Sequence, residues 1–238
     1  LMLPKEFDIQ ALRIVETYDE MKKNSRLDDD FFITTMINYR DTYIHVLTNG
    51  TNWENLRQTT VWNPQSLKNL GKDEKYIVGM IKHGDLWDVQ LASNTGITDQ
   101  RVVMIEDLDN LKEYIREQWR GGYDITDLVS DNGKYCVVSS LGLNWKQMWL
   151  FSSDYPDEAI QLATNEGKVL TDVISIGDEY LWMFSGNTGF QNQLVKFKPS
   201  TDEILFFRES VYSDDGYHGY SLSIIREVMG SLLFVFVR

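Results

Sequence analysis

The sequence predicts an all-β fold made of five repeats, because several apolar landmarks recur along it in a constant register. An isoleucine or leucine, here called the anchor, recurs at intervals of 44, 48, 45 and 52 residues. Another apolar residue follows three positions after each anchor, and an aromatic residue or a leucine follows ten positions after it. The anchors are Ile33, Ile77, Ile125, Leu170 and Leu222. Units of about 47 residues with four strands each are typical of blades, so we expect a five-bladed β-propeller.

Each repeat is interpreted as four short strands. The first strand carries the anchor, and a turn rich in Asp, Asn and Gly, as at residues 131–134, leads to an apolar second strand such as residues 180–184. A third strand begins at a recurring glutamine. A more polar fourth strand, as at residues 159–163 and 204–208, precedes the next anchor. This gradient predicts blades with buried inner strands and solvated outer strands.

The two ends of the chain are predicted to complete one blade together, so that residues 1–238 form a single domain. The chain stops after a second strand at residues 232–236, and residues 1–3 and 11–15 align with a third and a fourth strand. Such closure would remove the exposed sheet edges. A fragment of a six- or seven-bladed ring is the alternative. Residues 108–119 fit either an outer strand or a helical turn between blades.

The charge balance excludes several classes of partner. Against 23 Lys and Arg stand 36 Asp and Glu, which gives a net charge of −13 and a pI of about 4.6. A chain this acidic lacks the positive surface that nucleic acids and anionic membranes attract. No apolar run approaches the roughly 18 residues of a membrane span, so we expect a soluble protein. The single cysteine, Cys136, excludes an internal disulfide, lies in an apolar strand, and favours a cytoplasmic location.

One segment carries a family resemblance. Residues 115–126 read Ile-Arg-Glu-Gln-Trp-Arg-Gly-Gly-Tyr-Asp-Ile-Thr, and residues 135–140, Gln147 and residues 155–160 follow at the expected spacing. These segments resemble a repeat family of unknown function with the pattern Trp-x-x-Gly-Tyr-x-Ile-Thr, most closely over residues 108–197. The resemblance implies an accessory module attached to protein-kinase or caspase-like peptidase domains. It implies no catalytic residues.

The sequence indicates no metal or cofactor site. The three histidines and one cysteine lack the spacing of transition-metal ligands, and no phosphate-binding or dinucleotide-binding glycine motif occurs. We therefore expect no cofactor and no enzyme activity based on one.

The candidate binding residues lie in the loops that precede the glutamines. They are Asn52, Trp53, Asn144, Trp145 and Phe190. Loops of this kind gather on one rim of a propeller, where an exposed aromatic ring can recognise a protein partner or a sugar. The alternative is that each ring packs between neighbouring blades.

Two acidic residues are the alternative candidate site. Asp127 and Asp172 each lie two positions after an anchor, which would place them close together near the axis. Glycosidases use such pairs, with one protonated and one ionised carboxyl group. The competing interpretation is that both residues cap turns or pair with neighbouring threonines.

The recurring glutamines, Gln58, Gln100, Gln147 and Gln193, are interpreted as structural. An amide side chain both donates and accepts, so it can satisfy backbone groups. Two functions remain open. The first is a non-enzymatic interaction or ligand-sensing propeller that regulates an attached or partner effector, and the second is a carbohydrate-binding or glycoside-hydrolase-type propeller.

Overall fold

A computed structural model of the chain describes residues 9–17, 19–20, 31–40, 42–49, 51–67, 75–198 and 220–238. Over these residues the fold is all-β, with five three-stranded antiparallel sheets. The strands are β1 (Ile9–Val15), β2 (Phe31–Tyr39), β3 (Thr42–Asn49), β4 (Glu54–Val61), β5 (Tyr76–His83), β6 (Leu86–Ser93), β7 (Asp99–Ile105), β8 (Tyr123–Asp131), β9 (Lys134–Leu141), β10 (Lys146–Ser152), β11 (Lys168–Ile176), β12 (Glu179–Gly186), β13 (Gln193–Lys198), β14 (Ser221–Val228) and β15 (Ser231–Val237). The helices are α2 (Leu108–Arg120), α3 (Asp157–Asn165) and the 3-10 helix η1 (Pro64–Leu67).

Each sheet is built from one contiguous stretch of chain. The outer strand comes first, the inner strand second and the middle strand third, as in the order β1-β3-β2. We number the sheets 1 to 5 along the chain: sheet 1 holds β1 to β3, sheet 2 β4 to β6, sheet 3 β7 to β9, sheet 4 β10 to β12 and sheet 5 β13 to β15.

The strand that begins at each glutamine was predicted to share a blade with the preceding anchor. The structure instead pairs it within the next sheet, as β10 pairs with β12.

The ends of the chain do not share a sheet, which corrects the predicted closure. Strand β1 pairs with β3, so residues 11–15 form the outer strand of sheet 1 and not a fourth strand of the last sheet. Sheet 5 is completed by its own outer strand, β13. Residues 1–3 and 204–208, which were predicted as strands, lie outside the described residues.

A helix replaces the predicted fourth strand after two of the outer strands. Residues 108–119 form α2, whose buried Leu111 and Ile115 are four positions apart. Residues 159–163 lie in α3, where Ile160 and Ala163 are buried while Leu162 is exposed. A strand would have placed Ile160 and Leu162 on one face, so the burial pattern has the helical period.

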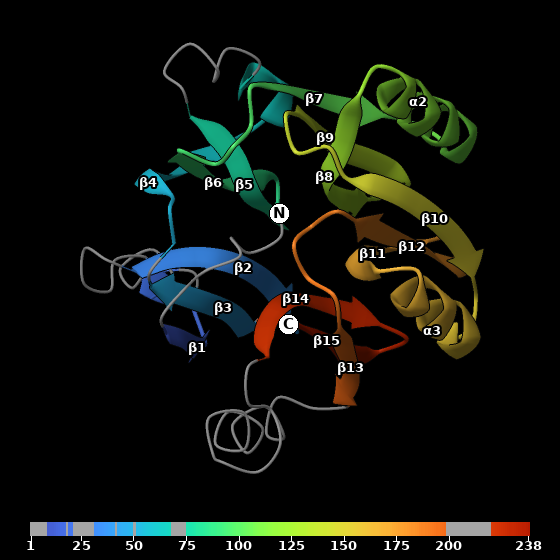
Figure 1. Cartoon of the computed structure of the whole chain (residues 1–238). Helices are drawn as coiled ribbons and strands as arrows, with labels where there is room; N and C mark the ends of the chain where they lie inside the picture. Colours follow the sequence, from blue (N-terminus) through green and yellow to red (C-terminus); the bar gives the residue numbers. More distant parts are fainter. Residues whose placement is uncertain are drawn as a thin grey trace.

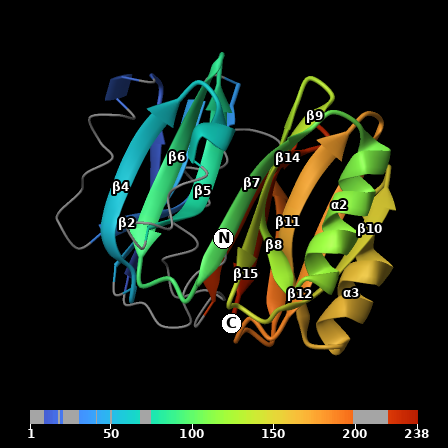
Figure 2. The ribbon, with the colours of Figure 1, turned by 90° about the horizontal axis from the view of Figure 1, so that it is seen from above.

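The five sheets surround a common centre (Figure 1). The inner strands β2, β5, β8, β11 and β14 contact one another in a closed cycle, and β14 of sheet 5 contacts β2 of sheet 1. An apolar core lies at each of the five boundaries between neighbouring sheets. Helices α2 and α3 lie on the outer side of the sheets, as Figure 2 shows from above. The buried apolar side chains of α2 belong to the core between sheets 3 and 4, and those of α3 belong to the core between sheets 4 and 5.

The boundary between the last and the first sheet is packed as tightly as the others. Tyr39 and Ile44 of sheet 1 meet Phe234 and Phe236 of sheet 5, and all four side chains are fully buried. Full burial of a large apolar side chain contributes roughly 1.5–3 kcal/mol, so this boundary is a substantial part of the core.

A β-bulge follows every anchor in the structure. The pairing register shifts between the anchor and the residue two positions later in all five inner strands. A bulge inserts one unpaired residue and disrupts the ladder locally, so nearby backbone groups need partners from elsewhere.

The recurring glutamines supply those partners across the sheet boundaries. The amide of Ile125 donates to Gln147 Oε1 at 2.7 Å, and Gln147 Nε2 donates to the Ile125 carbonyl at 2.8 Å. Gln100 makes the same pair of bonds to Ile77, at 2.7 and 3.0 Å. Gln193 accepts from the amide of Leu170 at 2.7 Å. The predicted structural role is therefore confirmed for Gln100, Gln147 and Gln193, with the anchor of the preceding sheet as the target.

A fifth glutamine, which the repeat analysis missed, joins the two ends of the fold. Gln10 on β1 accepts from the Leu222 amide at 2.8 Å and donates to the Leu222 carbonyl at 3.0 Å. Gln58 on β4 differs from the other glutamines: it pairs with Gln90, two positions from Ala92, which is the residue equivalent to their partners. Its Nε2 has no hydrogen-bond partner among the described residues. Sheets 5 and 1 are thus joined by the same pair of bonds that joins sheets 3 and 4.

No helix in the described part of the chain is both long and apolar enough to cross a membrane.

Candidate functional site

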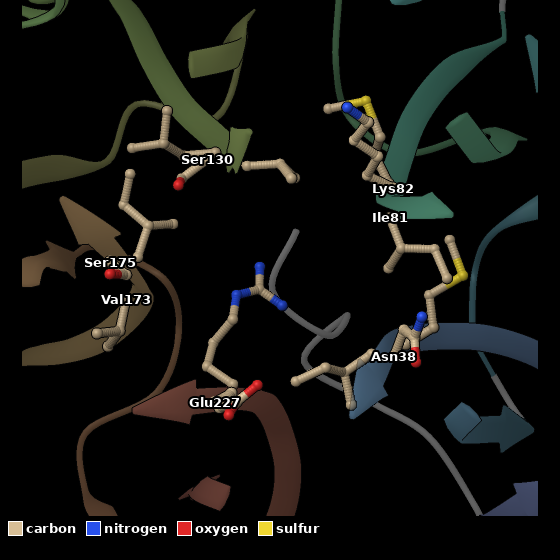
Figure 3. Close-up of a pocket in the computed structure, with 14 residues that line it drawn as sticks. Asn38, Ile81, Lys82, Ser130, Val173, Ser175 and Glu227 are labelled. Carbon is tan, nitrogen blue, oxygen red and sulfur yellow. The ribbon is translucent and has the colours of Figure 1, made fainter. Parts of the chain in front are cut away.

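The five inner strands converge on a cavity at one end of the axis. Its volume is about 260 Å³, and every inner strand contributes residues to its lining (Figure 3). Five polar residues, each five positions after an anchor, line this end, and we call them the mouth ring. They are Asn38, Lys82, Ser130, Ser175 and Glu227. The repeat therefore builds a polar ring around an opening whose deeper lining, such as Ile81 and Val173, is apolar.

Arg226 breaks the repeat inside this cavity. The residues four positions after the other anchors are aliphatic: Ile37, Ile81, Val129 and Ile174. Arg226 Nε donates to Asp172 Oδ1 at 2.7 Å, and its Nη2 lies 3.4 Å from Asp127 Oδ1. The guanidinium of sheet 5 thereby joins carboxylates from sheets 3 and 4.

The two carboxyl groups predicted as an acidic pair do lie together. Backbone amides also donate to them: Leu128 to Asp127 Oδ1 at 3.0 Å and to Asp172 Oδ2 at 3.1 Å, and Val173 to Asp172 Oδ1 at 2.9 Å. Burial raises the pKa of Asp127, with Asp172 adding to the rise and Arg226 opposing it. Because one guanidinium engages both carboxylates, the cluster holds three sheets together at the axis.

Charge pairing extends to the mouth ring. Lys82 of sheet 2 forms an ion pair with Asp131, at the end of β8 in sheet 3. Side chains at this end of the axis thus bind neighbouring sheets to one another as well as lining the cavity.

Trp53, Trp145 and Phe190 share one repeat position, twenty residues after an anchor. Trp53 is 5% exposed and Phe190 is 7% exposed, and Ile97 occupies the same position with 6%. Trp53 packs with Val78 and Ala92. Phe190 lies in the core between sheets 4 and 5, whereas Trp53 packs against sheet 2, so the burial of both rings argues against their being exposed recognition elements.

The other rim residues are more accessible. Asn52 and Asn144 are exposed, and Trp145 is half-buried. Asn144 adopts a left-handed backbone conformation, with φ of 57°. Asn144 and Trp145 line a second cavity, between sheets 3 and 4, at the end of β8 opposite the axial cavity.

Cys136 is fully buried and packs in the core between sheets 2 and 3, as the sequence predicted. Burial raises the pKa of its thiol, which keeps it unreactive. Within the described residues, no group of three or more His, Cys, Asp or Glu side chains is arranged to hold a metal ion.

Comparison with known proteins gives one family match. A family model described as a domain of unknown function (DUF7477) matches residues 64–217. That range includes residues 115–160, which carry the repeat pattern found in the sequence. No curated protein and no solved structure matches the chain.

We expect Arg226→Met to destabilise the fold by about 3–5 kcal/mol at neutral pH, because it leaves two buried carboxylates without their cation. Without the guanidinium, the pKa of Asp127 in the folded state rises further above its unfolded value. The loss of stability is therefore largest at a pH above the folded-state pKa of Asp127, and it becomes smaller as the pH falls below that pKa. Urea unfolding at pH 7 and pH 4 measures both effects. A loss below about 1 kcal/mol at pH 7 would show that the cluster is not structural.

Trp53→Ala and Trp62→Ala form a matched pair. Trp53 is buried, so its removal leaves a cavity and should cost about 3–5 kcal/mol. Trp62 is 75% exposed, so the same substitution there should change stability by less than about 0.5 kcal/mol. Thermal unfolding of both variants tests the placement. Equal effects would contradict the burial of Trp53 in the core.

Proposed function

We propose that this chain, which belongs to the family of the domain of unknown function DUF7477, is a closed five-bladed β-propeller that acts as a non-enzymatic protein-binding module. The closed cycle of inner-strand contacts, the five cores between sheets and the Gln10–Leu222 bonds support the propeller. Each blade then has three strands, and in two blades a helix takes the fourth, outermost position. Residues 9–237 would form one domain, because each sheet packs on both neighbours.

The observation that carries the binding role is the apolar surface at the axial end. Three large apolar side chains are exposed in the described part of the chain: Trp62, Leu162 and Met229. Trp62 directly follows β4, and Met229 lies in the hairpin between β14 and β15. Both residues lie at the ends of their sheets on the side of the mouth ring, Trp62 after the outer strand of sheet 2 and Met229 two positions after Glu227. Exposed Trp is enriched among residues that dominate protein interfaces, so this end is the proposed docking face.

The charged residues of the cavity support binding over catalysis. Both candidate carboxylates already accept from Arg226 and from backbone amides, so they have structural work independent of any substrate. The partner is proposed to be a protein or an attached effector domain. The resemblance to repeats joined to kinase and caspase-like peptidase domains supports this choice and an intracellular location.

A glycoside-hydrolase-type or carbohydrate-binding propeller is the second candidate, and one observation favours it. Asp127 lies beside Asp172 near the axis, and burial raises the pKa of Asp127. Asp127 would then be the general acid of a hydrolytic pair and Asp172 the ionised partner. In that case Asp127→Asn would abolish hydrolysis of an aryl glycoside while leaving the fold intact.

Site-specific crosslinking tests the docking face. A photoreactive amino acid placed at Ser175 or at Trp62 should capture the same protein in cells that express the chain, because both positions lie at the axial end. The same group placed at Leu162, an exposed position on α3, is the matched control and should not capture that protein.

Capture of one set of proteins from all three positions, or of none from the axial end, would contradict the docking face. Met229→Ala should reduce the capture from Ser175 without lowering the melting temperature, since Met229 is 40% exposed.

A further inference from the structure

A second cavity lies between sheets 3 and 4, away from the axis. Its volume is about 330 Å³. Helix α2, strand β8 and the loop before β10 form its walls, and the residues that matter are Trp119, Tyr123, Asp124, Asn144, Trp145 and Gln147. None of these residues lines the axial cavity, so the two sites are separate.

Asp124 is the buried acidic residue of this cavity, and the backbone amides of Asn144 and Trp145 donate to its carboxylate. It is 4% exposed, and its Oδ2 accepts from the backbone amide of Trp145 at 3.0 Å. Asp124 forms no ion pair within the described part of the chain. The residues before the other anchors are uncharged: Phe32, Tyr76, Val169 and Ser221. The repeat therefore folds without a carboxylate here, and a buried carboxylate without a cation is costly.

Three side-chain donors around the cavity are already engaged. Trp119 Nε1 donates to Gln147 Oε1 at 2.8 Å, and Gln147 Nε2 donates to Ser185 Oγ at 3.0 Å. The Tyr123 hydroxyl donates to Asp99. The cavity thus presents a carboxylate acceptor beside aromatic rings, which suits a ligand that brings its own N–H donors and positive charge. A sugar would need donors from the protein as well.

Two charged groups near the cavity, Asp99 and Arg101, are both engaged with Tyr123. The Arg101 guanidinium stacks 3.9 Å from the centre of the Tyr123 ring. Burial raises the pKa of Asp124 to about 6, so its carboxyl group is ionised at pH 7.5. The net charge of −13 also favours the approach of cations.

We propose that this cavity binds an alkylammonium group, with the Asp124 carboxylate as counter-ion and the indole rings of Trp119 and Trp145 beside the alkyl chain. Aromatic faces and a carboxylate together favour a desolvated cation. The ammonium group belongs either to a free amine or to a lysine side chain of another protein.

Butylammonium chloride is the first probe, followed by NMR of the indole N–H signals at pH 7.5. The signals of Trp119 and Trp145 should shift saturably, and the neutral isostere 1-butanol should bind at least tenfold more weakly. Potassium chloride at equal ionic strength should cause no such shift. N-acetyl-lysine methylamide, as the second probe, separates the sources. Binding of this probe assigns a protein lysine as ligand, whereas binding of butylammonium alone assigns a free amine.

Asp124→Asn keeps an oxygen to accept from the Trp145 amide and removes the charge, so it should weaken butylammonium binding at least tenfold. Asp178→Asn, in the exposed turn between β11 and β12, removes the same charge elsewhere and should bind as the unaltered chain does. Equal binding of butanol and butylammonium overturns the proposal, as does undiminished binding to Asp124→Asn or the absence of saturable shifts. The butanol comparison needs no variant, so the test holds even if Asp124→Asn fails to fold.

Discussion

The hydrogen bonds between a glutamine side chain and the backbone of an anchor residue are the constraint on which this fold depends. A bulge after each anchor disrupts the ladder of the inner strand, and the amide and carbonyl of the buried anchor must find partners elsewhere. A glutamine on the outer strand of the next sheet can satisfy both groups at once, as Gln147 does for Ile125. At four of the five boundaries the sheets are therefore joined by polar contacts of fixed geometry as well as by the less directional apolar cores between them.

Departures from the repeat mark the two candidate sites. Arg226 stands where the other inner strands carry an aliphatic residue, and it joins carboxylates from two further sheets. Asp124 stands where the other repeats carry uncharged residues, and it has no cation partner within the described part of the chain. The charge of Arg226 is balanced by carboxylates inside the protein, so this departure stabilises the fold. The charge of Asp124 is met by backbone amides but by no cation among the described residues, which is why we assign its cationic partner to a ligand.

The sequence predicted the inner and middle strands and the structural glutamines, because their period and apolarity are local properties. It did not predict which strands share a sheet, since the pattern of β10 is equally compatible with either neighbouring sheet. The run around Ile160 fits a strand or a helix, and only its burial pattern in the structure distinguishes them. The approach of Asp127 to Asp172 followed from the repeat register. The role of Arg226 was not predicted, because one cation in a strand gives no local signal. Aligning all five repeats at that position would have shown that Arg226 replaces an aliphatic residue.

Native-state hydrogen exchange of the anchor amides tests ring closure most directly. The amides of Ile77, Ile125, Leu170 and Leu222 all donate to a glutamine Oε1 atom. If the ring is closed by the same interaction that joins neighbouring sheets, all four amides should exchange with one free energy, equal to that of global unfolding. Exchange of the Leu222 amide at a free energy several kcal/mol below the other three would show that sheets 1 and 5 separate independently, and would contradict closure by Gln10.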